Sequence, residues 1–171
     1  MRYVMCFSIP SVELACHHIL RLVVVGVMRG SRTRPADILV TNWDNGISAA
    51  FDVTVASPLN SSTITEAGMY SGAAARAAEL RKHTQNDPKC AELGWKCIPL
   101  AVECYGAWGP EALKAFSQVA TRLAIRGNTS KSMALTDLFG RLSHSLIRAN
   151  ARAILSRSYS HLVQQVDELC V

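Results

Sequence analysis

The sequence predicts an α/β fold, in which a small central sheet contains an antiparallel hairpin and is flanked by helices. Three observations predict it: two alternating apolar segments meet near Asn45-Gly46, a third apolar segment covers 97–104, and helix-forming segments separate and follow these strands. The chain has 171 residues, of which 49% are hydrophobic and 18% are charged, enough to bury one core. This composition excludes a disordered protein and a disulfide-dense mini-protein.

The hairpin is predicted from its turn chemistry. Asn-Gly is the strongest short hairpin signal, and strands are expected on either side of it, at 35–41 and 49–55. The third strand, at 97–104, contains Pro99, which favours a strand start or a sheet edge. Glu103 in this strand either forms an ion pair at the edge of the core or joins an acidic cluster.

Helices are expected over most of the remaining chain. One runs over 66–83 from a threonine cap and is ended by Asn86-Asp87-Pro88. Pro110 stands at the favoured first position of another, which reaches about residue 126. A long helix over 130–157 and a short terminal helix over 163–171 follow.

These elements divide the chain into three parts. Residues 1–30 are a poorly defined N-terminal helix or a foreign segment, residues 31–110 form the core, and residues 111–171 form C-terminal helices packed on or beside it. Net charge differs along the chain: residues 37–111 are acidic, whereas the segments before and after them are basic. This pattern is typical of a cation site beside a surface that binds polyanions, or of ordinary solvated helix faces.

The six cysteines include no C-x-x-C pair. Free buried thiols are therefore preferred to a zinc site, and a reducing compartment, the nucleus or cytoplasm, is expected rather than secretion. No apolar stretch reaches the roughly 18 residues of a membrane span, so no membrane partner is expected.

Asp37 and Asp52 lie one in each strand of the predicted hairpin. If Asp44-Asn45 form the turn centre, the two aspartates face each other; if Asn45-Gly46 form it, they are diagonal neighbours. Both registers place the two carboxylates on one face of the sheet. Like charges at this separation repel unless a divalent cation lies between them, so neutralising Asp52 should leave the metal-free chain equally or slightly more stable. The alternative is two solvated aspartates on the wet face of the hairpin.

The segment Arg34-Pro35-Ala36-Asp37, followed by a gap of fourteen residues and Asp52, resembles the restriction-like, PD-(D/E)xK type endonuclease domain of non-LTR retrotransposon reverse transcriptases. Blocks at 50–55, 99–103 and 105–109 resemble those of transposon-derived reading frames in the same order, and the resemblance covers 34 to about 157. It implies a nuclease-like core with a C-terminal helical extension and Mg²⁺- or Mn²⁺-dependent hydrolysis of DNA. Asp37 and Asp52 would then be the metal ligands.

The resemblance also designates a catalytic lysine. The usual lysine two residues after the second acid is Thr54 here, and in the retrotransposon type the lysine comes from the following helix, which indicates Lys82. The alternative for Lys82 is a cation that complements the end of that helix. The fold type also has an acid before its first strand, for which Glu13 is the candidate.

Arg141, Arg148 and Arg152 lie within about 40° of one another on a helical wheel. A separate apolar stripe consists of Leu135, Leu138, Leu142, Leu146 and Ala153. An arginine row beside a nuclease core is expected to contact DNA phosphates, although an ordinary solvated face has the same pattern. Two alternative functions stay open: a catalytically inactive remnant that binds nucleic acid weakly, and a helical interaction module with no nucleic-acid role.

Overall fold

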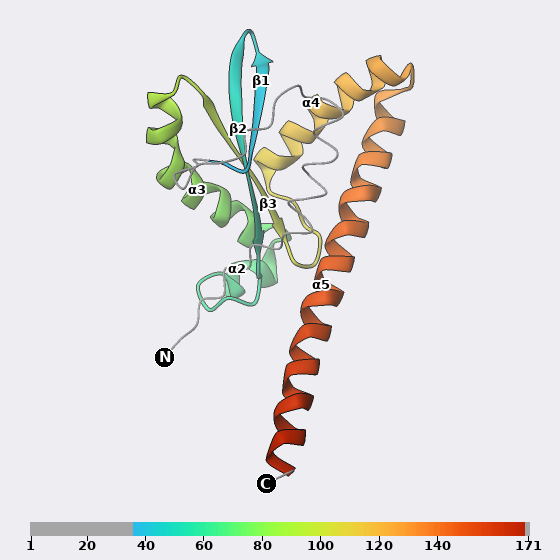
Figure 1. Ribbon diagram of the computed structural model, residues 1–171. Helices are drawn as coiled ribbons and strands as arrows, with labels where there is room; N and C mark the ends of the chain where they lie inside the picture. The colour runs from blue at the N-terminus through green and yellow to red at the C-terminus, as the bar shows by residue number, and fades with distance from the viewer. Residues whose placement is uncertain (1–35, 170–171) are drawn as a thin grey trace.

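The computed structural model describes residues 36–169, with side chains up to residue 156. Three strands form one mixed sheet in the order β1-β2-β3, with bounds Ile38–Asp44, Ile47–Ala56 and Lys96–Glu103. β1 pairs antiparallel with β2, and β2 pairs parallel with β3 (Figure 1). The predicted α/β fold with an antiparallel hairpin is confirmed. The predictions for residues 1–30, including that for Glu13, lie outside the described residues.

The hairpin contains both of the registers that the sequence leaves open. The pairs from Ile38↔Phe51 to Val40↔Ala49 follow the register in which Asp37 opposes Asp52, whereas Asp44↔Ile47 follows the other. The irregularity between them includes Asn42, which has a φ of 54° and accepts a 3.1 Å hydrogen bond from the amide of Gly46. β1 starts and ends three residues later than predicted, at Ile38 and Asp44.

The helix predicted over 66–83 is two helices. α2 (Ile64–Met69) ends before Gly72, whose φ of 84° redirects the chain into α3 (Ala73–Glu92). The prediction that Asn86-Asp87-Pro88 ends the helix is wrong, because α3 continues through them. Contacts of this last part of α3 with the sheet, which include the buried Cys90, offset the cost of about 3 kcal/mol for a proline in a helix.

The C-terminal half consists of two antiparallel helices, α4 (Pro110–Gly127) and α5 (Lys131–Leu169). α4 begins at Pro110 and ends within a residue of the prediction. A separate terminal helix over 163–171 is wrong as far as the structure describes it, since α5 is continuous to Leu169. The predicted apolar stripe is confirmed at Leu138, Leu142 and Leu146, which are buried, while Leu135 and Ala153 are half-buried.

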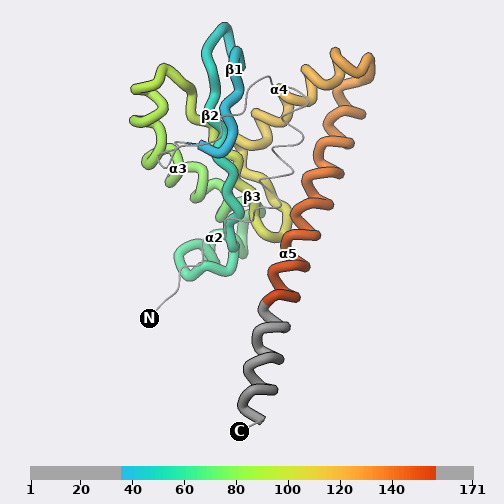
Figure 2. Tube along the Cα trace, viewed as in Figure 1, coloured from blue at the N-terminus to red at the C-terminus, as the bar shows by residue number. Residues whose placement is uncertain are grey.

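The helices cover opposite sides of the sheet. Alternate residues of β2, from Ala49 to Val55, pack with α4 and α5 in the main core. The residues between them face α3, whose alanines Ala75 and Ala78 pack against Ala101 of β3. In Figure 2 the sheet accordingly runs between α3 on one side and α4 with α5 on the other. The molecule is thus three layers thick, and each predicted site residue can be assigned to one layer.

Candidate functional site

The candidate site lies where α3 packs against β2. The ammonium of Lys82 contacts both oxygens of the Asp52 carboxylate, at 3.1 Å from Oδ1 and 2.9 Å from Oδ2. The side-chain amide of Asn86 donates a further hydrogen bond of 2.6 Å to Oδ2. Asp52 is only 5% exposed. A carboxylate at this burial requires such partners, because an unpaired buried charge is costly.

Local sequence explains why these three side chains meet. Asp52 points toward α3 because both of its neighbours in β2 belong to the core on the other side. Lys82 and Asn86 are four residues apart on α3 and therefore share a face of the helix. Ala75 and Ala78, which have no exposed surface, bring the preceding turns of α3 close to the sheet. The small side chains thus set the distance at which Lys82 reaches Asp52.

Asp37 lies beside Asp52, directly before β1. Its amide donates a 3.0 Å hydrogen bond to the carbonyl of Phe51, and its Oδ2 accepts one of 2.7 Å from the amide of Val53. Asp37 therefore bridges the two residues that flank Asp52 in sequence. Its carboxylate therefore lies at the backbone of β2, one residue from Asp52 along the chain.

Thr54 occupies the position at which the resembled family has its usual lysine. Its side chain is buried, and its hydroxyl has no hydrogen-bond partner in the part of the chain that the structure describes. Across the ladder it pairs with Ala101, which packs against the alanines of α3. The cation that contacts Asp52 comes instead from α3, as Lys82.

The carboxylate oxygens of Asp37 and Asp52 are of the type that a hard divalent cation prefers as ligands. Mg²⁺ is held by one or two carboxylates, and water and substrate oxygens fill its remaining positions. Asp37 and Asp52 supply two carboxylates at adjoining positions, and the Lys82 ammonium neutralises one of them. The Lys82 side chain is 24% exposed and flexible, so it can turn toward solvent and release an oxygen of Asp52.

Two other buried carboxylates accept hydrogen bonds from the first amides of helices and do not contact Asp37 or Asp52 in any described hydrogen bond. Glu79 of α3 accepts hydrogen bonds from the amides of Glu111 and Ala112, at 3.2 and 3.0 Å, at the start of α4. Burial raises the pKa of Glu79, although these hydrogen bonds oppose the shift. Glu103 accepts a 2.9 Å hydrogen bond from the amide of Ala74 at the start of α3. Both carboxylates therefore act as caps from a distant part of the sequence.

The arginines predicted to bind nucleic acid lie elsewhere. Arg141, Arg148 and Arg152 are all exposed on α5, and Arg141 forms an ion pair of 2.9 Å with Asp137. Because α5 and α3 cover opposite sides of the sheet, the structure does not bring the arginines together with Asp52 (Figure 1).

Sequence reasoning missed one member of the site, Asn86. The Asn86-Asp87-Pro88 segment predicts the end of a helix, so its side chains had no assigned position. The available signal was the spacing of four residues from Lys82, which places both side chains on one face if the helix continues.

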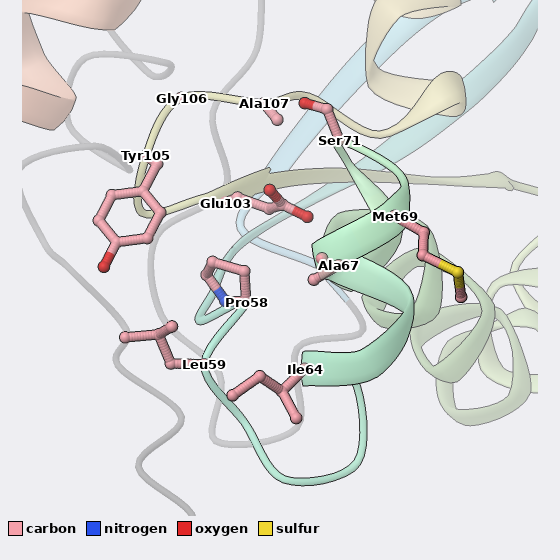
Figure 3. A pocket seen from close by; sticks show the side chains of 11 residues that line it. Pro58, Leu59, Ile64, Ala67, Met69, Ser71, Glu103, Tyr105, Gly106 and Ala107 are labelled. Carbon is pink, nitrogen blue, oxygen red and sulfur yellow. The ribbon is translucent and has the colours of Figure 1, made fainter.

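A separate pocket of about 640 Å³ lies at the other end of the β2–β3 ladder. It is bounded by α2 and by the loops that follow β2 and β3, and apolar side chains such as Leu59, Ile64 and Met69 line it around Glu103 (Figure 3). Glu103 pairs with Ala56, four residues along β2 from Asp52, or roughly 13 Å at the usual rise of a strand. The pocket is therefore distinct from the Asp52 site.

None of the helices described in the structure is both long enough and apolar enough to span a membrane. Comparison of the chain with protein-family models, with curated proteins and with solved structures finds no match. The functional argument therefore depends on the residues and contacts of this chain.

Proposed function

We propose that this chain is a metal-dependent endonuclease domain that hydrolyses phosphodiester bonds of DNA. The observation that carries the proposal is the contact of Lys82 with Asp52 at 2.9 Å, between residues thirty positions apart. The sequence resemblance designates both residues independently of this contact. A lysine at the end of its helix would have a simpler explanation, but α3 runs ten residues beyond Lys82, and Lys89 is the basic residue of its last turn.

Each residue has a distinct role in this proposal. Asp37 and Asp52 would hold Mg²⁺ or Mn²⁺, which when bound supplies an activated water and neutralises charge on the phosphate. Lys82 would donate hydrogen bonds to a non-bridging oxygen of the scissile phosphate, where negative charge develops. Asn86 would fix the rotamer of Asp52 through its hydrogen bond to Oδ2. The proposed reaction is a hydrolysis and includes no redox step.

Plasmid nicking with Mg²⁺ or Mn²⁺ tests the chemistry. Wild type should nick supercoiled DNA, and Lys82→Met should lower the rate about 10²- to 10³-fold, the range for removal of one electrostatic stabiliser. Asp52→Asn should remove nicking, since it weakens the anionic ligation that Mg²⁺ prefers. Lys89→Met, which removes an exposed lysine from the same helix, is the matched control and should keep the wild-type rate. Equal loss in Lys82→Met and Lys89→Met would contradict the assignment of Lys82.

DNA binding is the second part of the proposal and has its own test. Arg141, Arg148 and Arg152 are exposed and lie along one helix, so they suit binding to successive phosphates. Replacing all three with Gln should reduce the slope of log affinity against log salt by about one unit for each phosphate that the variant no longer binds. An unchanged slope would identify this row as a solvated face.

A catalytically inactive remnant that binds nucleic acid is the second candidate function. The observation that favours it is that the arginines lie on α5, on the opposite side of the sheet from Asp52 and Lys82. Salt-sensitive binding without nicking would support the remnant. Neither binding nor nicking would support a helical interaction module.

A further inference from the structure

A second group of potential metal ligands lies at the last turns of α3, beside the start of β3. Donor atoms of His83, Asp87 and Cys97 all lie within 4.8 Å of one another. Cys90 lies beside this group, because it packs with Cys97 in one small buried cluster. His83, Asp87 and Cys90 follow one another at intervals of four and three residues, so they share one face of α3.

We propose that His83, Asp87, Cys90 and Cys97 form a zinc site. Imidazole nitrogen, thiolate sulfur and carboxylate oxygen are the three donor types that zinc takes in proteins, usually four to a tetrahedral site. Bonds of 2.0–2.3 Å place ligand atoms about 3.3–3.8 Å apart on a tetrahedral ion. The His83–Asp87 contact is already shorter, at 2.9 Å. For His83, Asp87 and Cys97, closing the group around an ion therefore takes side-chain shifts of about 1 Å.

The surroundings of His83 support this assignment independently of the donor group. Nδ1 faces Asp87, whereas Nε2 lies 3.2 Å from Oε2 of Glu111 at the start of α4. A metal-binding imidazole typically donates its other N–H to a carboxylate, which fixes the tautomer and orients the ring. Glu111 is in that position. The remaining nitrogen, Nδ1, then presents its lone pair to the group of potential ligands.

Burial also suits a site of this kind. Cys90 is 1% exposed and Cys97 is 7% exposed, and both are free thiols. His83 and Asp87 lie nearer the surface, with 27% and 53% of their side chains exposed. The two sulfurs thus face the protein interior, and the nitrogen and oxygen face the side from which an ion can enter.

A zinc ion here would join three elements. α3 supplies three ligands, β3 supplies Cys97, and α4 supplies the carboxylate that orients His83. The joined part of α3 includes Lys82 and Asn86, the two residues that contact Asp52. The inferred role is structural, since it fastens the last turns of α3 to the sheet. It does not rest on the proposed nuclease activity.

Cobalt substitution of the reduced, metal-stripped full chain tests the site. Co²⁺ should give a thiolate-to-metal charge-transfer band and strong visible bands at one ion per chain, and Zn²⁺ should remove both. Carboxylates alone give no thiolate band, so this signal does not report on Asp37 and Asp52. Cys97→Ser and His83→Gln should lose the tetrahedral spectrum, whereas Cys104→Ser, the matched thiol control outside the group, should keep it.

The role of Glu111 gives a second measurement. Glu111→Ala should keep the cobalt spectrum but weaken Zn²⁺ affinity about 10- to 100-fold, the usual effect of losing the carboxylate behind a histidine ligand. Zn²⁺ should also raise the melting temperature of wild type and Cys104→Ser but not of His83→Gln. Absence of a thiolate band in wild type, or a band of full intensity in both Cys97→Ser and His83→Gln, would overturn the proposal. The group would then be a network of hydrogen bonds and ion pairs only.

Discussion

The two sides of the sheet differ in what they bury. The side toward α4 and α5 buries large apolar side chains, such as Phe51, Leu100, Phe116 and Leu142. The side toward α3 buries alanines and two thiols together with the polar side chains of Asp52, Thr54 and Glu103. Large apolar groups stabilise a fold when they are buried, whereas polar groups cost free energy unless they are partnered. The side toward α4 and α5 therefore supplies most of the hydrophobic stabilisation, and the side toward α3 carries the polar and ionisable groups.

The side toward α3 tolerates its polar groups because nearly all of them have partners. Lys82 forms an ion pair with Asp52, and Asn86 donates a hydrogen bond to it. The amide of Ala74 donates a hydrogen bond to Glu103. Alanines make this arrangement possible, since a helix that presented leucines would stand further from the sheet and could not deliver these contacts. Substitutions on the two sides should consequently change the free energy of unfolding by different amounts and with different signs.

The largest effect is expected on the side toward α4 and α5. Phe116 is 1% exposed and packs edge-to-face against Trp108 and Phe139, with ring centroids 4.9 and 5.7 Å away. Phe116→Ala should lower the free energy of unfolding by about 3–5 kcal/mol, because it removes a large side chain and leaves a cavity. Urea denaturation followed by circular dichroism measures this. Leu113→Ala, at a half-exposed position of the same helix, should cost far less, and equal losses would show that burial of Phe116 in this core does not cause the loss.

The junction between the two sides should show the next largest effect. A Cβ atom at Gly109 would clash with the carboxylate of Glu79, which caps α4. Gly109→Ala should therefore cost about 2–3 kcal/mol, since either the cap or the backbone must shift. Gly140→Ala in α5 is the control: apart from the backbone of α5 and the two neighbouring residues, the described residues place no atom within 4 Å of its added Cβ, and alanine should stabilise the helix by about 1 kcal/mol. A fall in melting temperature for the first variant and a rise for the second are expected.

The Asp52–Lys82 pair tests whether the chemical side also contributes to stability. The sequence alone predicts that Asp52→Asn relieves repulsion and leaves the chain equally or slightly more stable. The ion pair changes this expectation, because the substitution leaves Lys82 without its counter-charge. We therefore expect a loss of about 1–3 kcal/mol in metal-free buffer.

A double-mutant cycle separates the pair from its surroundings. Asp52→Asn and Lys82→Met should each destabilise the chain, and the double variant should lose less than the sum of the two, with a coupling energy of about 0.5–3 kcal/mol. Additive losses would show that the Lys82 ammonium does not stabilise the buried carboxylate of Asp52.

Sequence reasoning predicted the elements that depend on local chemistry. Asn45-Gly46 predicted the hairpin and Pro110 predicted the start of α4, because a turn type and a missing N–H act within a few residues. It failed at Pro88, because the local sequence predicts that this proline ends the helix. Packing of the last turns of α3 against the sheet keeps the helix intact there. Such long-range contacts have no signal within one segment.

The candidate site shows the same limit. Asp37 and Asp52 followed from the hairpin, and Lys82 followed from the resemblance to a nuclease family that takes its lysine from a helix. Asn86 was missed because its helix was expected to have ended. The group of His83, Asp87 and Cys97, with Cys90 beside it, lacks the C-x-x-C spacing and depends on how α3 meets β3. Its assembly therefore becomes visible only in three dimensions.

The smallest expected effect is a gain in stability on the side toward α3. Thr54 buries a hydroxyl for which the described residues supply no partner, directly beside the alanines of α3. Thr54→Val replaces this hydroxyl with a methyl group of similar size and should raise the free energy of unfolding by up to about 1 kcal/mol. Thr84→Val is the control, since the Thr84 hydroxyl is exposed and already donates to the carbonyl of Leu80, and it should change stability by less than about 0.5 kcal/mol. A loss in Thr54→Val would mean that a bound water satisfies the hydroxyl, and that the polar side of the sheet leaves no group unpaired.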